Sequence, residues 1–126
     1  LAIAACSGMG GHTKDSPPEE KQAVVKERAN ARWAALIKGD IDTAYAYSSP
    51  ASRKAVSIES FAGRRGAAKY TAATVESVTC EAEACQVQIK LTYDYPVMRG
   101  KVMKGIQTPL TETWVLDNGT AWMVLR

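Results

Sequence analysis

Our prediction of the fold starts from the residues Cys85 to Tyr95, which read CQVQIKLTYDY. Apolar or aromatic residues stand at every second position from Val87 to Tyr95, with polar residues between them. A period of two is typical of a strand with one face on a core and the other in water. Such a split is common only in antiparallel sheets, because parallel strands are usually covered on both faces. We therefore expect an antiparallel sheet whose apolar face the rest of the chain must cover.

A long helix before this strand can supply the cover. It is expected to begin near Pro18, with Ser16 or Asp15 as its cap, and to end at Gly39 in the left-handed conformation. Three- and four-residue steps place five apolar residues on one stripe of this helix. They are Val25, Ala29, Trp33, Leu36 and Ile37.

Two shorter helices are predicted to follow. Asp40 is placed to cap the first, which the proline at position 50 stops. Ser57 is placed to cap the second, from Ile58 to about Arg65. The intervening Ala51 to Val56 reads as a polar connector.

The remaining strands flank Cys85 to Tyr95. Tyr70 to Thr79 is predicted to precede it, with Thr71, Ala73, Val75, Ser77 and Thr79 on one face. Pro96 to Pro109 reads as an irregular basic segment that could hold a short strand. Leu110 to Leu116 and Ala121 to Leu125 are expected to form a final hairpin around Asp117-Asn118-Gly119, a strong turn signal.

Composition limits the classes of function. The 126 residues suffice for one domain, and 46% hydrophobic with 23% charged residues is typical of a globular protein. A net charge of +3 is too small for the basic balance of a nucleic-acid-binding protein. No apolar run reaches the roughly 20 residues that span a bilayer.

The N-terminal residues resemble a bacterial lipoprotein signal. Ile3-Ala4-Ala5-Cys6 is similar to a lipobox, in which an aliphatic residue and two small residues precede the acylated cysteine. This resemblance implies that residues 1–5 are the remnant of a signal peptide and that Cys6 carries lipid chains. Ser7 implies sorting to the outer membrane, facing the periplasm, and residues 6–18 read as a flexible tether. The alternative is an apolar end with a free thiol.

The other two cysteines favour export. Cys80 and Cys85 flank a four-residue loop, which places them opposite each other on neighbouring antiparallel strands. A disulfide there is common in exported proteins. The alternatives are two reduced thiols or half a metal site, and zinc is disfavoured because the one histidine, His12, lies in the tether.

Helices followed by antiparallel strands predict an α+β domain of four to five strands. Several short motifs occur in this order along the domain: Trp33-Ala34-Ala35-Leu36, Gly39-Asp40, Ala44-Tyr45, Ser49-Pro50 and Trp122. With them, the chain from Glu19 to Arg126 resembles the NTF2-like, cystatin-like superfamily, whose curved sheet wraps a long helix as a cone. The resemblance implies a pocket at the open end of the cone, with the candidate lining residues Trp33, Tyr45, Tyr93, Tyr95, Glu112 and Trp114. The alternative is that these side chains only fill the core.

Catalytic candidates are few. Enzymes of this superfamily set an acid beside a tyrosine or a histidine, whereas the predicted domain contains no histidine. Alternation turns Asp94 outward, Asp42 lies on a short helix, and Glu112 shares a face with Trp114. No metal-ligand or nucleophile motif stands out, so no cofactor is predicted and catalysis is disfavoured.

Basic residues suggest a surface for anionic partners. Arg53, Lys54, Arg64, Arg65 and Lys69 lie within seventeen residues that hold a single acid, Glu59. A second cluster consists of Arg99, Lys101 and Lys104. Ordinary solvated charge is the alternative, and the clusters lack the interleaved aromatic residues that stack on bases.

The sequence thus predicts a lipid-anchored protein of a bacterial cell envelope that binds a protein partner or an envelope component without catalysis. The alternative function is that of a carrier for a small apolar ligand. A second copy of the chain, in a homodimer, is a candidate partner. An isomerase or dehydratase with Glu112 or Asp42 as base ranks last.

Overall fold

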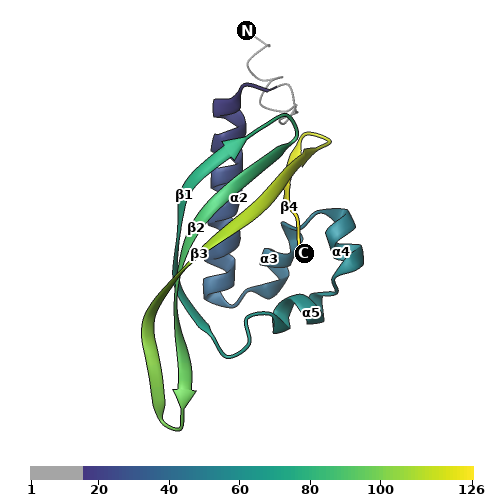
Figure 1. Cartoon of the computed structure of the whole chain (residues 1–126). Helices are drawn as coiled ribbons and strands as arrows, with labels where there is room; N and C mark the ends of the chain where they lie inside the picture. Colours follow the sequence, from purple (N-terminus) through teal and green to yellow (C-terminus); the bar gives the residue numbers. More distant parts are fainter. Residues whose placement is uncertain (1–15) are drawn as a thin grey trace.

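The computed structural model describes residues 16–126, which form four helices followed by four strands (Figure 1). The helices pack against a four-stranded antiparallel sheet, which confirms the predicted α+β class. The predicted signal remnant, Cys6 and most of the tether lie outside the described residues. The elements are α2 (Pro18–Lys38), α3 (Ile41–Ala46), α4 (Pro50–Ala55), α5 (Ile58–Gly63), β1 (Lys69–Cys80), β2 (Ala84–Met98), β3 (Lys101–Asp117) and β4 (Thr120–Met123).

Helix α2 lies across one face of the sheet (Figure 1). Its N-cap residue is Pro17 rather than the predicted Ser16 or Asp15, because the pre-set φ of Pro18 suits the first helical position. Gly39 ends the helix at a φ of 83°, as predicted. The apolar stripe is buried except for Ile37, which is 36% exposed because it lies one position around the helix from Leu36.

The short helices depend on side-chain caps. Asp40 accepts a hydrogen bond from the backbone N–H of Thr43 at the start of α3, and Ser57 caps α5 as predicted. The predicted connector was wrong, because Pro50–Ala55 forms helix α4. Ser49 caps it and Pro50 occupies its first turn, a combination that favours a helix start.

Strand β2 has the predicted faces. Val87, Ile89 and Leu91 are at most 5% exposed, whereas Gln86 and Gln88 lie on the solvent face. The sheet order is β1-β2-β3-β4, so β2 is an inner strand with a neighbour on each side. One face of β2 therefore packs towards α2 and the other stays open.

Two irregularities in β1 change its predicted faces. The pairing with β2 shifts between Tyr70 and Ala72 and again between Val75 and Ser77. Each shift adds one unpaired residue and reverses the alternation beyond it. The half-buried positions are therefore Tyr70, Ala73, Val75, Val78 and Cys80, which strict alternation had divided between two faces.

The predicted irregular segment, Pro96 to Pro109, is instead part of a long hairpin. Strands β2 and β3 continue past the end of β1 and meet at a turn containing Gly100, whose φ is 72°. Both prolines occur where their strand has only one neighbour, so no second ladder of hydrogen bonds is broken. We call residues 95–106 the arm, and Figure 1 shows it extending beyond the helices.

The C-terminal hairpin closes the opposite edge of the sheet. Asn118 and Gly119 both have positive φ values, 51° and 77°, as the predicted two-residue turn requires. Met123 forms a bridge to Ser48, and Ser52 Oγ accepts a hydrogen bond from the Leu125 N–H at 2.9 Å. These contacts tie the end of the chain to the short helices. Within residues 16–126 no helix has the length and apolar character needed to cross a bilayer.

Candidate functional site: an apolar groove beside a cluster of arginines

Glu112, the one acid expected inside the sheet, is buried in a hydrogen-bond network. Its side chain is 4% exposed. Glu112 Oε2 lies 2.7 Å from Arg32 Nη1 and accepts the Trp33 Nε1–H at 2.9 Å. Glu112 Oε1 accepts the Trp114 Nε1–H at 3.1 Å. Both carboxylate oxygens are therefore engaged by donors from α2 and β3, and no tyrosine is among these partners.

Arg32 is held in the same interior. Burial lowers the pKa of its guanidinium, while the charge of Glu112 opposes that shift. The guanidinium also lies 5.5 Å from the centre of the Trp33 ring. Three donors already engage this carboxylate and its side chain is almost fully buried, so it is poorly placed to take a proton from a substrate. The geometry of Glu112 is therefore that of a structural ion pair.

The aromatic candidates for the pocket separate into two groups. Trp33 and Trp114 are at most 6% exposed and fill the core. Tyr45 is half-buried, donates a hydrogen bond to the Val56 carbonyl at 2.6 Å and packs on Phe61. Tyr93 and Tyr95 line one hollow, and Trp33 lines a second, smaller one. Side chains thus occupy most of the interior of the predicted cone, and the larger open surface lies further along β2.

This open surface is an apolar groove of about 410 Å³ on the arm and the adjoining sheet. Its floor comes from alternate residues of β2 and β3, and its rim includes Arg65 and Ala68 from the segment before β1. Tyr95, Val97 and Met103 are 42%, 48% and 53% exposed. A volume of this size is within the range of small-molecule sites, about 300–1,000 Å³. The lining also includes Tyr70, Leu91, Tyr93, Ile106, Thr108 and Leu110.

A smaller hollow of about 140 Å³ adjoins the groove beside α5. Three arginines line it, namely Arg32, Arg64 and Arg65. Arg65 stacks over Tyr70, 5.6 Å from the ring centre, and donates to the Leu36 carbonyl at 3.3 Å. Arg65 and Tyr70 line both hollows, so the two are neighbours.

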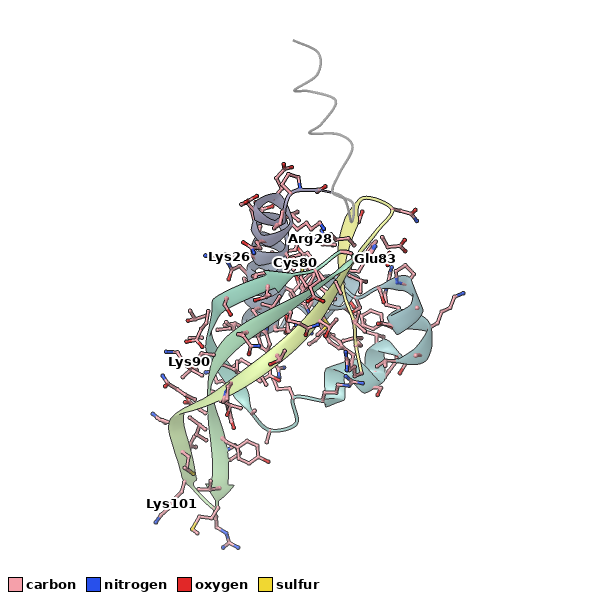
Figure 2. All side chains as sticks on the ribbon, turned by 45° about the horizontal axis from the view of Figure 1, so that its top comes forward. Lys26, Arg28, Cys80, Glu83, Lys90 and Lys101 are labelled. Atoms are coloured by element: carbon pink, nitrogen blue, oxygen red, sulfur yellow. A yellow bond between two sulfur atoms is a disulfide. The ribbon has the colours of Figure 1, made fainter. Side chains whose placement is uncertain are left out.

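The basic residues predicted to share one face occupy different regions. Arg53 lies over the Trp122 ring of β4, at one edge of the sheet. Arg65 lies over Tyr70 of β1, at the other edge. Arg64 and Lys69 are close to Arg65 in sequence and are exposed, whereas Lys54 is exposed on α4. The second cluster, Arg99, Lys101 and Lys104, lies at the free end of the arm, where Figure 2 labels Lys101.

A separate group of arginines and aromatic rings joins α2 to the C-terminal hairpin. The Arg28 guanidinium lies 4.7 Å from the ring centre of Tyr47 and 5.7 Å from that of Trp122. Arg28 Nε donates to the Ala121 carbonyl at 2.7 Å, and burial lowers the pKa of its guanidinium. This group therefore contributes packing between α2 and the C-terminal hairpin.

The remaining acids do not form a reactive site. Asp42 is exposed on α3, and Asp94 accepts a hydrogen bond from the Gly105 N–H at 2.9 Å. Within the described part of the chain no three histidine, cysteine or acidic side chains gather as a metal site would need. Cys80 and Cys85 form the predicted disulfide across β1 and β2, with an S–S distance of 2.02 Å.

Sequence reasoning named Tyr93 and Tyr95 as lining residues but missed the rest of the groove, in part because Val97, Met103 and Ile106 lie in the segment interpreted as irregular. The signal that could have found them was the alternation of Tyr93, Tyr95 and Val97, which continues past Pro96. The three-arginine hollow had no such signal, because Arg32 is distant in sequence from Arg64 and Arg65.

The chain matches no protein-family model and none of the curated proteins with which it was compared.

Proposed function

We propose that this chain is a lipid-anchored protein of a bacterial cell envelope, and that its NTF2-like domain binds an envelope component or a protein partner without catalysing a reaction. The groove on the arm is the observation that carries the proposal. Exposed apolar side chains on a soluble domain usually mark a binding surface. Here they lie in one hollow beside cationic residues.

The filled interior supports binding over catalysis. An isomerase or dehydratase would need a carboxylate within reach of both a substrate and a proton donor such as tyrosine. Glu112 is enclosed by Arg32, Trp33 and Trp114. Asp42 is exposed on a helix surface. Neither acid lines the groove.

The location in the envelope is supported by the lipobox-like Ile3-Ala4-Ala5-Cys6 and by the Cys80–Cys85 disulfide. Disulfides persist mainly in oxidising compartments, which include the periplasm. A diacylated cysteine supplies the two chains that stable anchoring requires. We propose Cys6 as that anchor, with Ser7 directing the protein to the outer membrane.

A carrier of a small apolar ligand is the second candidate, and the volume of the groove favours it. Native mass spectrometry of the protein purified from its own envelope tests both functions. The proposal predicts an acyl mass on Cys6. A stoichiometric apolar molecule that survives purification would favour the carrier. A chain with an unmodified Cys6 would contradict the envelope anchor.

A further inference from the structure

The groove and the three-arginine hollow share two lining residues, Arg65 and Tyr70, and we call the place where they adjoin the junction. On one side the surface is apolar, because Leu91, Ile106 and Met103 line the groove. On the other side the apolar and aromatic lining of the hollow is joined by three arginines, Arg32, Arg64 and Arg65. A ligand that satisfies both sides must carry an apolar part and an anionic part on one molecule.

The charges at the junction are unbalanced. Among the described residues that line the two hollows, none is acidic. Glu112 neutralises Arg32 through Nη1, while Arg32 Nε is buried without a hydrogen-bond partner in this part of the chain. Arginines bind carboxylates and phosphates through paired N–H donors, which makes an anionic head the matching group.

Size selects the apolar part. The groove has a volume of about 410 Å³, and most of its lining comes from two neighbouring strands along the arm and the adjoining sheet. A lining that follows two paired strands fits one extended chain better than a pair of chains. The adjoining hollow of about 140 Å³ has room for a small head group only.

We propose that the junction binds a single-chain anionic amphiphile, with its head at Arg32, Arg64 and Arg65 and its chain along the groove. This inference rests on the proposed function, because it names the envelope component that the binding domain recognises. Fatty acids and single-chain lipid phosphates share this chemistry. The head group decides between them.

The test is isothermal titration calorimetry on the full chain carrying Cys6→Ser, so that no acyl anchor competes for the groove. The probes are laurate and lauryl phosphate, each below its critical micelle concentration, and lauryl alcohol below its solubility limit. We expect at least one of the two anions to bind about tenfold or more tightly than the alcohol, since charge-assisted hydrogen bonds supply the difference. The tighter anion then identifies the head group. Equal affinity for the alcohol and both anions, or no binding of any probe, would overturn the proposal.

Variants locate the two halves of the site. Arg64→Gln with Arg65→Gln is expected to weaken anion binding by about tenfold or more and to leave the alcohol unchanged. Arg53→Gln with Lys54→Gln removes the same charge on α4 and is the matched control, with no expected change. Ile106→Asp is expected to weaken all probes, because it places a charge in the groove. Urea unfolding of each variant checks that it is folded. Anion binding that survives Arg64→Gln with Arg65→Gln in a folded protein would refute the proposed head site.

The two proposals fail separately. An acylated Cys6 in the native protein, together with no amphiphile binding, would leave the envelope function standing and remove the ligand. Laurate binding by the Cys6→Ser chain, together with an unmodified Cys6 in the native protein, would keep the ligand and remove the anchor.

Discussion

The buried pair of Arg32 and Glu112 gives the sharpest prediction about what holds the fold together. Glu112→Gln keeps the shape of the side chain and one acceptor oxygen but removes its charge. The Arg32 guanidinium, only 4% exposed, then lacks its counter-charge, which was 2.7 Å away. Removing one partner of a buried ion pair costs about 3–5 kcal/mol. Domains of this kind have a total unfolding free energy of about 5–15 kcal/mol, so this one change would cost a large fraction.

A second substitution in the same pair, Arg32→Met, should change the unfolding free energy in opposite directions in the two backgrounds. Arg32→Met alone leaves a buried carboxylate with two indole donors and should also destabilise the fold. In the Glu112→Gln background the same Arg32→Met removes an unpaired charge, so it should raise the unfolding free energy by about 1 kcal/mol or more. Urea unfolding followed by fluorescence reports on it directly, because Trp33 and Trp114 both contact Glu112. If Arg32→Met destabilises both backgrounds equally, the ion pair is not what the two residues contribute.

Three further predictions concern local features. First, the hydrogen bond from Thr43 lowers the pKa of Asp40, so the stability that its charge adds is present at neutral pH and lost as the pH falls through its folded pKa. The difference in unfolding free energy between the wild type and Asp40→Asn should therefore vanish in acid, and a pH-independent difference would count against the charge. Second, Cys80→Ala with Cys85→Ala should lower stability by about 2 kcal/mol, since the bridge closes a short loop. A reductant should bring the wild type to the same urea midpoint, and no response to reductant would exclude this contribution. Third, Gly39→Ala should cost about 1 kcal/mol because the φ of Gly39 is 83°, whereas Gly63→Ala, with equal space around it and no positive φ, should be neutral or stabilising. Thermal unfolding of the two variants compares them, and equal shifts would contradict the backbone explanation.

The predictable part of this fold is the part in which one short pattern determines the structure. The alternation from Val87 to Leu91 fixed the buried face of β2, because a one-residue slip would expose the whole apolar set. The caps at Asp40 and Ser57 are equally local, since each needs only a side-chain acceptor ahead of a helix.

The part that could not be predicted depends on distant residues or on a change of environment along one strand. The irregularities in β1 arise from pairing with β2, and no residue type within β1 predicts their positions. Tyr95 continues the inward alternation of β2 but is 42% exposed, because the strand there has left the body of the protein. Arg32 and Glu112 come from α2 and β3, so their pairing appears only in the folded chain.

The groove depends both on distant residues and on a change of environment along one strand. Part of its floor is an extension of a predicted strand, and the arginines beside it come from α2 and from the segment between α5 and β1. The alternation of apolar residues could have extended the predicted strand β2 to Val97. Neither the charge of Arg65 nor its spacing in the sequence predicts that its guanidinium stacks over the Tyr70 ring.

The central claim is that the groove side of the sheet is the working surface and that the opposite face is ordinary solvent-exposed sheet. Val97 lines the groove and is 48% exposed, whereas Gln88 is exposed on the opposite face, where its Oε1 accepts a hydrogen bond from Thr111 at 3.0 Å. A photo-reactive amino acid placed at either position, in the cells that naturally make the protein, compares the two faces directly. We predict adducts, with lipid or with protein, from position 97 and none above background from position 88. Equal labelling from both positions, or labelling from position 88 alone, would contradict the account.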